Sequence, residues 1–201
     1  LAAPIPYKHS TLGIWHLDSL PFKNEVTGAT ASPGGIGTLS TSTGVRFGAG
    51  CFYANSAGYC WLSFANATAL TDFTFEVWIT GQTGGPMVEG NLNVSSNNLR
   101  LAGGYGAVVT SWPSQGEQTN MHFAVSRKAG VIKVFFGGIQ KNTDVTNNTV
   151  MDLSSLALGY FAGGPTYSYS YFDEVRLSDK CLYDADFTPP AAPFTLPSGV
   201  Y

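Results

Sequence analysis

The stretch TDFTFEVWI, residues 71–79, alternates polar and apolar side chains with a period of two. Successive side chains of a β-strand point to opposite faces of the sheet. The stretch therefore predicts a strand with one face in a core and one face turned away from it. The core face would carry Phe73, Phe75, Val77 and Ile79, and the other face Thr74, Glu76 and Trp78.

The same alternation recurs along the chain, and helical periodicity is nearly absent. MHFAVSRKAGVIKVFFGG predicts a hairpin with strands at 121–127 and 131–136 joined by RKAG, followed by a third strand near 139–141. Further short strands are predicted in GVRFGAGCFYA, YCWLSF, LSSLALGYF and YSYSYFDEVRLS. Many short strands separated by glycine-rich turns predict an all-β fold, an antiparallel β-sandwich of the jelly-roll type.

Composition narrows the class of protein. The chain has 201 residues, enough for one large β domain, and only 11% of them are charged, against about 25% in ordinary soluble domains. Its ten basic residues are scattered and its net charge is −3, so it lacks the clustered cations that nucleic acid binding requires. No apolar run approaches the roughly 18 residues of a transmembrane helix, so membrane insertion is not expected.

Five motifs together cover about residues 12–194. They are GIWHLD, VRFGAGCFYANSAGYCWLSF, LTDFTFEVWI, NMHFAVSRKAGVIKVFFGGIQ and YFDEVRLSDKCLYDADFTPPAAPF. These motifs and their order resemble those of laminin-G-like (concanavalin A-like) jelly rolls. The last motif resembles the version of this domain in bacteriophage virion proteins such as tail fibres and head decorations. One departure is that YANSAG, residues 53–58, replaces the usual acid-containing fDG.

The resemblance implies a non-catalytic structural module on the surface of a phage particle. Such a module would contact other virion proteins or its own copies as a homo-oligomer. The alternative is a secreted or surface carbohydrate-binding module that recognises a host-surface glycan. The expected organisation is an N-terminal strap or linker at 1–11, the jelly roll at 12–187, and a proline-rich strap at 188–201. TPPAAPF is expected to lie along a sheet edge, where proline blunts strand pairing.

Two consecutive acids, Asp173 and Glu174, open the end of the last long strand. A buried carboxylate costs several kcal/mol unless it is paired or hydrogen-bonded. One interpretation is that an inward acid accepts backbone N–H groups or pairs with Arg176, pinning the last strand to the first. The other, implied by the resemblance, is a structural Ca²⁺ held by Asp173 and Asp18, with carbonyls and waters completing its shell.

Cys51 and Cys60 flank FYANSAGY. If these residues form a hairpin, the two thiols face each other and a disulfide is one expectation. The alternative is two small core residues, which free cysteines often are.

Catalytic patterns are missing from the sequence. None of the thirteen acids forms the paired spacing of a glycosidase, and no GxSxG elbow or phosphate-binding loop is present. We therefore predict that the protein is not an enzyme. His16 and His122 are expected to be packed and hydrogen-bonded.

Aromatic residues fall into two groups. Trp15, Phe47, Phe73, Phe75, Phe123 and Phe135 occupy expected core positions. A second group in or beside glycine-rich loops would either stack sugar rings or pack at an interface between subunits: Tyr105, Trp112, Tyr160, Phe161, Tyr167 and Tyr169.

Overall fold

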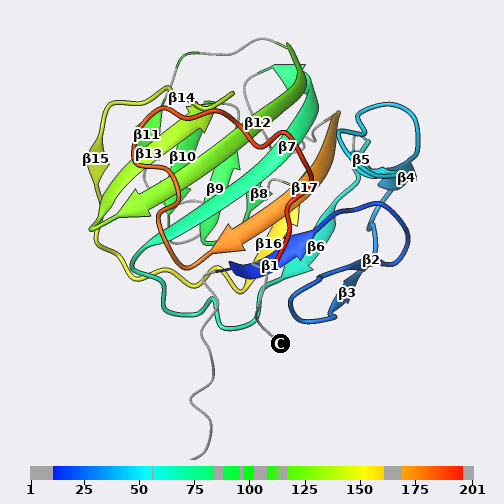
Figure 1. Cartoon of the computed structure of the whole chain (residues 1–201), viewed down its shortest axis with the longest axis horizontal. Helices are drawn as coiled ribbons and strands as arrows, with labels where there is room; N and C mark the ends of the chain where they lie inside the picture. Colours follow the sequence, from blue (N-terminus) through cyan, green and yellow to red (C-terminus); the bar gives the residue numbers. More distant parts are fainter. Residues whose placement is uncertain are drawn as a thin grey trace, which may run out of the picture.

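The computed structural model describes residues 11–55, 57–83, 88–95, 97–101, 108–111, 113, 117–160 and 169–196. Two antiparallel sheets pack face to face, one in front of the other in Figure 1. This confirms the predicted β-sandwich. Among the described residues, no helix has the length and apolar character needed to cross a bilayer.

The larger sheet has nine strands and follows the order β14-β13-β12-β7-β17-β5-β4, with β1 added on β17 and β15 on β13. The smaller sheet has six strands in the order β11-β10-β9-β8-β16-β6, and β2 and β3 form a separate pair. The larger sheet contains β1 (Thr11–Trp15), β4 (Thr38–Ser40), β5 (Cys51–Ala54), β7 (Phe73–Thr83), β12 (Glu117–Lys128), β13 (Val131–Phe136), β14 (Ile139–Gln140), β15 (Val145–Thr146) and β17 (Ser170–Ser178). The smaller sheet contains β6 (Cys60–Ser63), β8 (Val88–Glu89), β9 (Leu92–Ser95), β10 (Asn98–Leu101), β11 (Val108–Ser111) and β16 (Ser155–Leu158), and the pair is β2 (Phe22–Lys23) and β3 (Thr30–Ala31).

The alternation in residues 71–79 gives β7 its two environments. Phe73, Phe75, Val77 and Ile79 join the core between the sheets, as predicted. The hairpin of β12 and β13 also forms with the predicted strands, and its turn places Ala129 and Gly130 at positive φ.

The segment after β17 crosses the outer face of the larger sheet (Figure 1). Its Phe187 N–H donates to the carbonyl of Gly138, and the Phe187 ring packs on His122 of β12. Within TPPAAPF, Phe194 packs with Trp78 of β7 and its ring lies 6.4 Å from that of His122, so this segment lies over the face of the sheet and the expectation that it follows a sheet edge is wrong. The polar face of β7 lacks an opposing sheet, and residues 179–196 supply its cover. These residues include part of the predicted proline-rich segment and are called the strap from here on.

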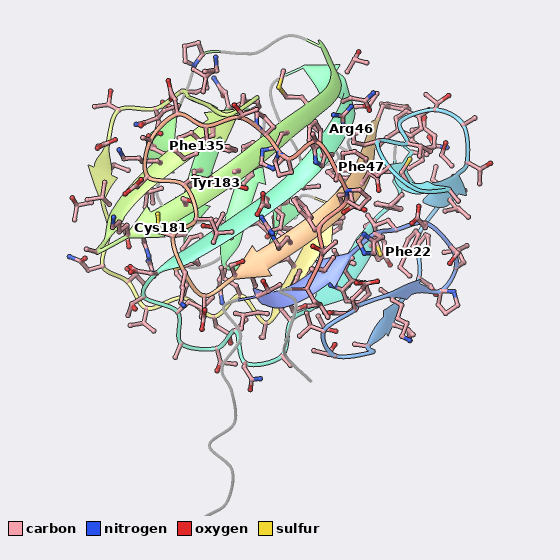
Figure 2. All side chains as sticks on the ribbon, in the orientation of Figure 1. Phe22, Arg46, Phe47, Phe135, Cys181 and Tyr183 are labelled. Atoms are coloured by element: carbon pink, nitrogen blue, oxygen red, sulfur yellow. The ribbon has the colours of Figure 1, made fainter. Side chains whose placement is uncertain are left out.

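This strap also changes the environment of two predicted core aromatics. Phe135 is fully buried, but its ring contacts Tyr183 and Phe187 of the strap. Phe47 packs with Ile14, Trp78 and Phe194 in a second, smaller apolar cluster. In Figure 2, Phe135 and Tyr183 lie together over the sheet, while Arg46 and Phe47 lie near one end of β17.

Candidate functional site

An exposed tryptophan marks the outer face of the smaller sheet. Along β6 the side chains alternate between buried and exposed, so Cys60 and Leu62 enter the core and Trp61 points outward. Trp61 is 45% exposed, so its indole presents a large apolar face to solvent. A single exposed apolar side chain is ordinary on a protein surface, so Trp61 marks a candidate binding surface only together with the groups that surround it.

The strand register places an acid in the same row as this tryptophan. Ala157 of β16 is the cross-strand partner of both Trp61 on β6 and Glu89 on β8. Residues opposite each other share a face, so Trp61 and Glu89 lie on the outer face, two strand spacings or roughly 10 Å apart at their Cα atoms.

Both residues line a groove of about 330 Å³. Gly90 shapes its wall: a Cβ on this residue would lie 2.9 Å from the carbonyl oxygen of Ser155. The groove combines one large aromatic side chain with amide, hydroxyl and carboxylate groups. Its described lining is Trp61, Glu89, Gly90, Asn91, Asp152, Ser154 and Ser155.

Hydrogen bonds fix the polar groups of this groove. The Glu89 carboxylate accepts a hydrogen bond from the side-chain amide of Asn93, which is fully buried. Asn91 Nδ2 donates to the Asp152 carbonyl at 2.9 Å. Hydrogen bonds from Ser154, including its backbone N–H at 3.0 Å, lower the pKa of the Asp152 carboxyl and keep it ionised.

Two tyrosines extend the aromatic wall. The ring of Tyr160 lies 6.3 Å from that of Trp61 and 5.7 Å from that of Tyr59. Of the predicted loop aromatics, Tyr160 thus belongs to the groove region, and Tyr169 is 56% exposed beside β17. The other four lie outside the described residues: Tyr105, Trp112, Phe161 and Tyr167.

Sequence reasoning did not select Trp61, Glu89, Asn91 or Asp152. The signal for Trp61 was present in YCWLSF, where it stands between two apolar residues that alternate into the core. The signal for the other three was absent, because they come together only through the pairing of β8, β16 and β6.

The two consecutive acids of β17, Asp173 and Glu174, have a structural role. Asp173 Oδ2 accepts hydrogen bonds from the backbone N–H groups of Arg46 and Phe47 at 2.7 and 3.0 Å. Asp18 Oδ1 accepts from Ala49 and Gly50 at 2.6 and 3.0 Å. The two aspartates therefore hold the loop that precedes β5.

These contacts bear on the expected calcium ion. N–H donors point at the carboxylate oxygens of both Asp18 and Asp173, the arrangement of a hydrogen-bonded anion and a poor fit to a cation. Among the described residues, no group of three or more His, Cys, Asp or Glu side chains is placed to hold a metal. The structure thus favours the hydrogen-bonding interpretation of Asp173.

Glu174 connects three parts of the chain. It is 1% exposed; its Oε1 contacts His16 Nδ1 at 2.5 Å and its Oε2 accepts the Phe194 N–H at 2.7 Å. A bulge between Asp173 and Arg176 interrupts the alternation of β17 and places Glu174 at a φ of 49°. Both consecutive acids can therefore avoid the apolar core. Glu174 accepts a backbone N–H, as one interpretation predicted, but that N–H belongs to the strap, and its partner near the first strand is the His16 side chain directly after β1.

Arg176 does not pair with either of these acids. Its Nε donates to Glu76 Oε1 at 2.7 Å, and its guanidinium lies 4.3 Å from the centre of the Phe194 ring. Glu76 also contacts His122 Nε2 at 2.9 Å and accepts the Tyr183 hydroxyl at 2.8 Å. His122 is packed and hydrogen-bonded, as expected. Glu76 and His122 are fully buried, so they hold the strap on the sheet rather than present a surface to a ligand.

The state of His16 makes stability depend on pH. Its hydrogen bond with Glu174 raises the pKa of His16 to about 9; burial opposes the rise, and the charges of Glu174 and Glu25 add to it. The folded state therefore holds the proton more tightly than the unfolded state, whose pKa is 6.5. The stabilisation is complete below pH 6.5 and is lost as the pH rises through 9.

We expect the free energy of unfolding to fall by about 2–3 kcal/mol between pH 6.5 and 9. Urea unfolding at several pH values would measure this. His16→Gln should flatten that part of the profile, while the exposed Lys128→Gln should leave its slope as it is. An equal slope in wild type and His16→Gln would show that another group is responsible.

The expected Cys51–Cys60 disulfide is absent, because Cys51, Cys60 and Cys181 are all free thiols. The two strands that were expected to form a hairpin belong to opposite sheets: β5 pairs with β17 and β4, and β6 pairs with β16. Cys60 packs in the core between the sheets, and the Cys51 thiol donates to the carbonyl of Thr43 at 3.4 Å. Burial is the main reason that the pKa of each thiol is raised to about 12, which keeps both protonated.

Comparison with solved structures supports the fold. Domain 4 of AbnA, a GH43 extracellular arabinanase from Geobacillus stearothermophilus solved with arabinotriose, superposes with a TM-score of 0.59 at 16% identity, covering 87% of this chain and 95% of that domain. The binding domain of botulinum neurotoxin DC in complex with SialylT gives a TM-score of 0.59 at 11% identity, over 87% of this chain and 49% of the toxin chain. A Trypanosoma rangeli sialidase solved with 2,3-difluorosialic acid gives a TM-score of 0.54 at 16% identity. The match covers 86% of this chain and 31% of the sialidase chain.

No protein-family model matches the sequence, and no curated protein matches it. The chain spans about half of the toxin chain and a third of the sialidase chain. At these identities the similarity establishes the β-sandwich jelly-roll class, and function has to be argued from the groove itself.

Proposed function

We propose that this protein is a carbohydrate-binding module that takes its ligand in the groove beside Trp61. The observation that carries the proposal is the 45% exposed indole at the edge of a groove lined by amide, hydroxyl and carboxylate groups. One face of a sugar ring is rich in C–H groups and stacks on an aromatic ring, while its hydroxyls need polar partners at the rim. Both requirements are met within one groove on a rigid sheet.

The fold neighbours add support of a limited kind. Domain 4 of AbnA was solved with arabinotriose and the toxin binding domain with SialylT, so saccharide-bound proteins occur among sandwiches of this architecture. The proposal includes binding without hydrolysis. Incubation with bound oligosaccharides should release no new reducing ends.

A virion structural role stays a prediction, and no comparison supports it. Homo-oligomerisation and a place on a phage particle or outside the cell are equally untested. The largest exposed apolar side chains of the described surface, among them Leu20, Ile36, Ile139, Val150 and Tyr169, come from separate segments. Light scattering of the purified chain would measure its oligomeric state directly.

Trp61→Ala is expected to weaken saccharide binding at least tenfold, because truncation of a tryptophan anchor commonly costs about 2 kcal/mol or more. A glycan array would identify a bound saccharide, and calorimetry would then compare the variant with wild type. Trp61→Phe should restore part of the affinity because it keeps a stacking face. Tyr169→Ala removes a similarly exposed aromatic elsewhere and should leave binding unchanged. Full binding by Trp61→Ala would reject the groove as the site.

A further inference from the structure

We infer that the groove beside Trp61 selects uncharged, hydroxyl-rich saccharides and rejects acidic ones such as sialylated or uronate-containing glycans. The inference rests on the proposed function and adds the chemical class of its ligand. It follows from the charge of the lining, from the direction of its hydrogen bonds, and from the position of the indole.

The charge of the lining is negative. Glu89 and Asp152 are acids, and none of the described lining residues is basic. Arg100 lies on β10, opposite Asn93 of β9, and β9 is the neighbour of β8, which carries Glu89. The positive charge of Arg100 therefore offsets part of the negative charge of Glu89. Asp152 lies outside this row, just before β16, and is largely exposed. A carboxylate or sulfate placed in the groove would therefore face at least one uncompensated negative charge.

Two polar side chains of the groove, Glu89 and Asp152, are acids, and an ionised carboxylate only accepts hydrogen bonds. Asn91 uses one of its two Nδ2 hydrogens on the carbonyl of Asp152, and its other hydrogen and its side-chain oxygen stay available to a ligand. Ser154 and Ser155 can donate or accept. A ligand must bring donors to satisfy the two carboxylates. Sugar hydroxyls provide them, whereas the carboxylate of a uronic or sialic acid can only accept.

The indole adds to the same preference. The face of an aromatic ring carries negative partial charge, so it favours C–H groups and disfavours anions. Trp61 forms the wall opposite Glu89 across Ala157. An acidic substituent would then meet the negative face of the indole and the exposed Asp152 carboxylate, whereas a neutral ring would meet a stacking surface and hydrogen-bond acceptors.

Matched saccharides that differ in their acidic groups test the inference. Two such pairs are lactose with 3′-sialyllactose and galactobiose with digalacturonic acid. Any neutral saccharide found on an array can also be compared with its sulfated form. We expect the neutral member of a bound pair to bind at least tenfold more tightly at low salt. Raising the salt concentration should narrow the gap, because exposed charges are screened. Asp152→Asn removes a charge at an exposed position and should also narrow the difference in affinity between the neutral and the acidic saccharide. Glu89→Gln is a second variant that removes the other acid of the groove and is tested in the same way.

The outcomes separate the inference from the function on which it rests. Tighter or equal binding of the acidic member, lost in Trp61→Ala, would overturn the preference and leave carbohydrate binding in place. A gap that Asp152→Asn and Glu89→Gln both leave unchanged would also overturn it. Failure of every saccharide to bind, or binding that ignores Trp61→Ala, would overturn the proposed function, and the preference with it.

Discussion

Glu76→Ala is expected to lower the free energy of unfolding by about 3–5 kcal/mol, because removing one partner of a buried ion pair leaves the other partner uncompensated. Glu76 is fully buried and accepts from Arg176, His122 and Tyr183 at 2.7, 2.9 and 2.8 Å. The variant leaves a guanidinium, an imidazole and a phenol without their shared acceptor. The strap, which contributes Tyr183, should lose one of its polar attachments to β7 and keep those of Thr74 to the Lys180 carbonyl and the Leu182 N–H.

Thermal and urea unfolding would measure this loss, which corresponds to a fall in melting temperature of roughly 6–20 °C for a chain of this size. Glu76→Gln keeps the shape and one acceptor and should cost less. Glu25→Ala removes a carboxylate that is 44% exposed and lies 3.3 Å from His16, so it should cost under about 1 kcal/mol. A loss below 1 kcal/mol for Glu76→Ala would show that the network contributes little to stability.

The same network predicts the response to acid. Burial alone would raise the pKa of Glu76, but the hydrogen bond from His122 and the charge of Arg176 hold it below the ordinary value. A carboxyl with a lowered pKa stabilises the fold above its unfolded pKa and loses that effect as the pH falls. Wild type should therefore lose stability below about pH 4.5, and Glu76→Gln should lose less over the same range.

The alternation in β7 could be read from the sequence, but the cover of its outer face could not. Thr74, Glu76 and Trp78 were placed on the face turned away from the core, and a strand pattern says nothing about what lies over that face. The strap buries all three at 5% exposure or less. The covering segment follows β17, about a hundred residues further along the chain, and irregular segments carry no periodic signal.

The bulge in the middle of β17 shows a second limit. Strict alternation requires one of Asp173 and Glu174 to point inward. The bulge inserts an extra residue here, so Phe172 and Val175 enter the core while both acids face the loop and strap. The sequence correctly indicated hydrogen-bonded acids in this strand but not their partners, because the bulge breaks the periodicity on which the argument depended.

The groove illustrates a third limit. Two strands close in sequence, β5 and β6, were expected to pair as a hairpin, and each instead joins a different sheet. Because β6 pairs with β16 and not with β5, Trp61 comes into one row with Ala157 and Glu89 on the smaller sheet. Long-range register assembles this site, and no local pattern encodes it.

Asp173→Ala is expected to cost about 2–4 kcal/mol, because it leaves the N–H groups of Arg46 and Phe47 without their acceptor at a site that is 1% exposed. Asp18→Ala is the matched control: it removes two N–H bonds to the same loop, but the bond to Ala49 is exposed to water, so it should cost under about 1 kcal/mol. Asp173→Asn keeps an acceptor oxygen and should stay within about 1 kcal/mol of wild type.

Burial raises the pKa of Asp173 to about 7, against the lowering effect of its backbone hydrogen bonds. The folded state thus retains the proton more tightly than the unfolded state, and the contribution of Asp173 to stability falls between pH 4 and 7. Asp173→Asn should flatten that part of the profile. Unfolding with and without a chelator completes the test of calcium: a bound ion stabilises only the native state, so chelation would lower the melting temperature. An unchanged melting temperature, together with the predicted cost of Asp173→Ala, would assign this carboxylate to the loop alone.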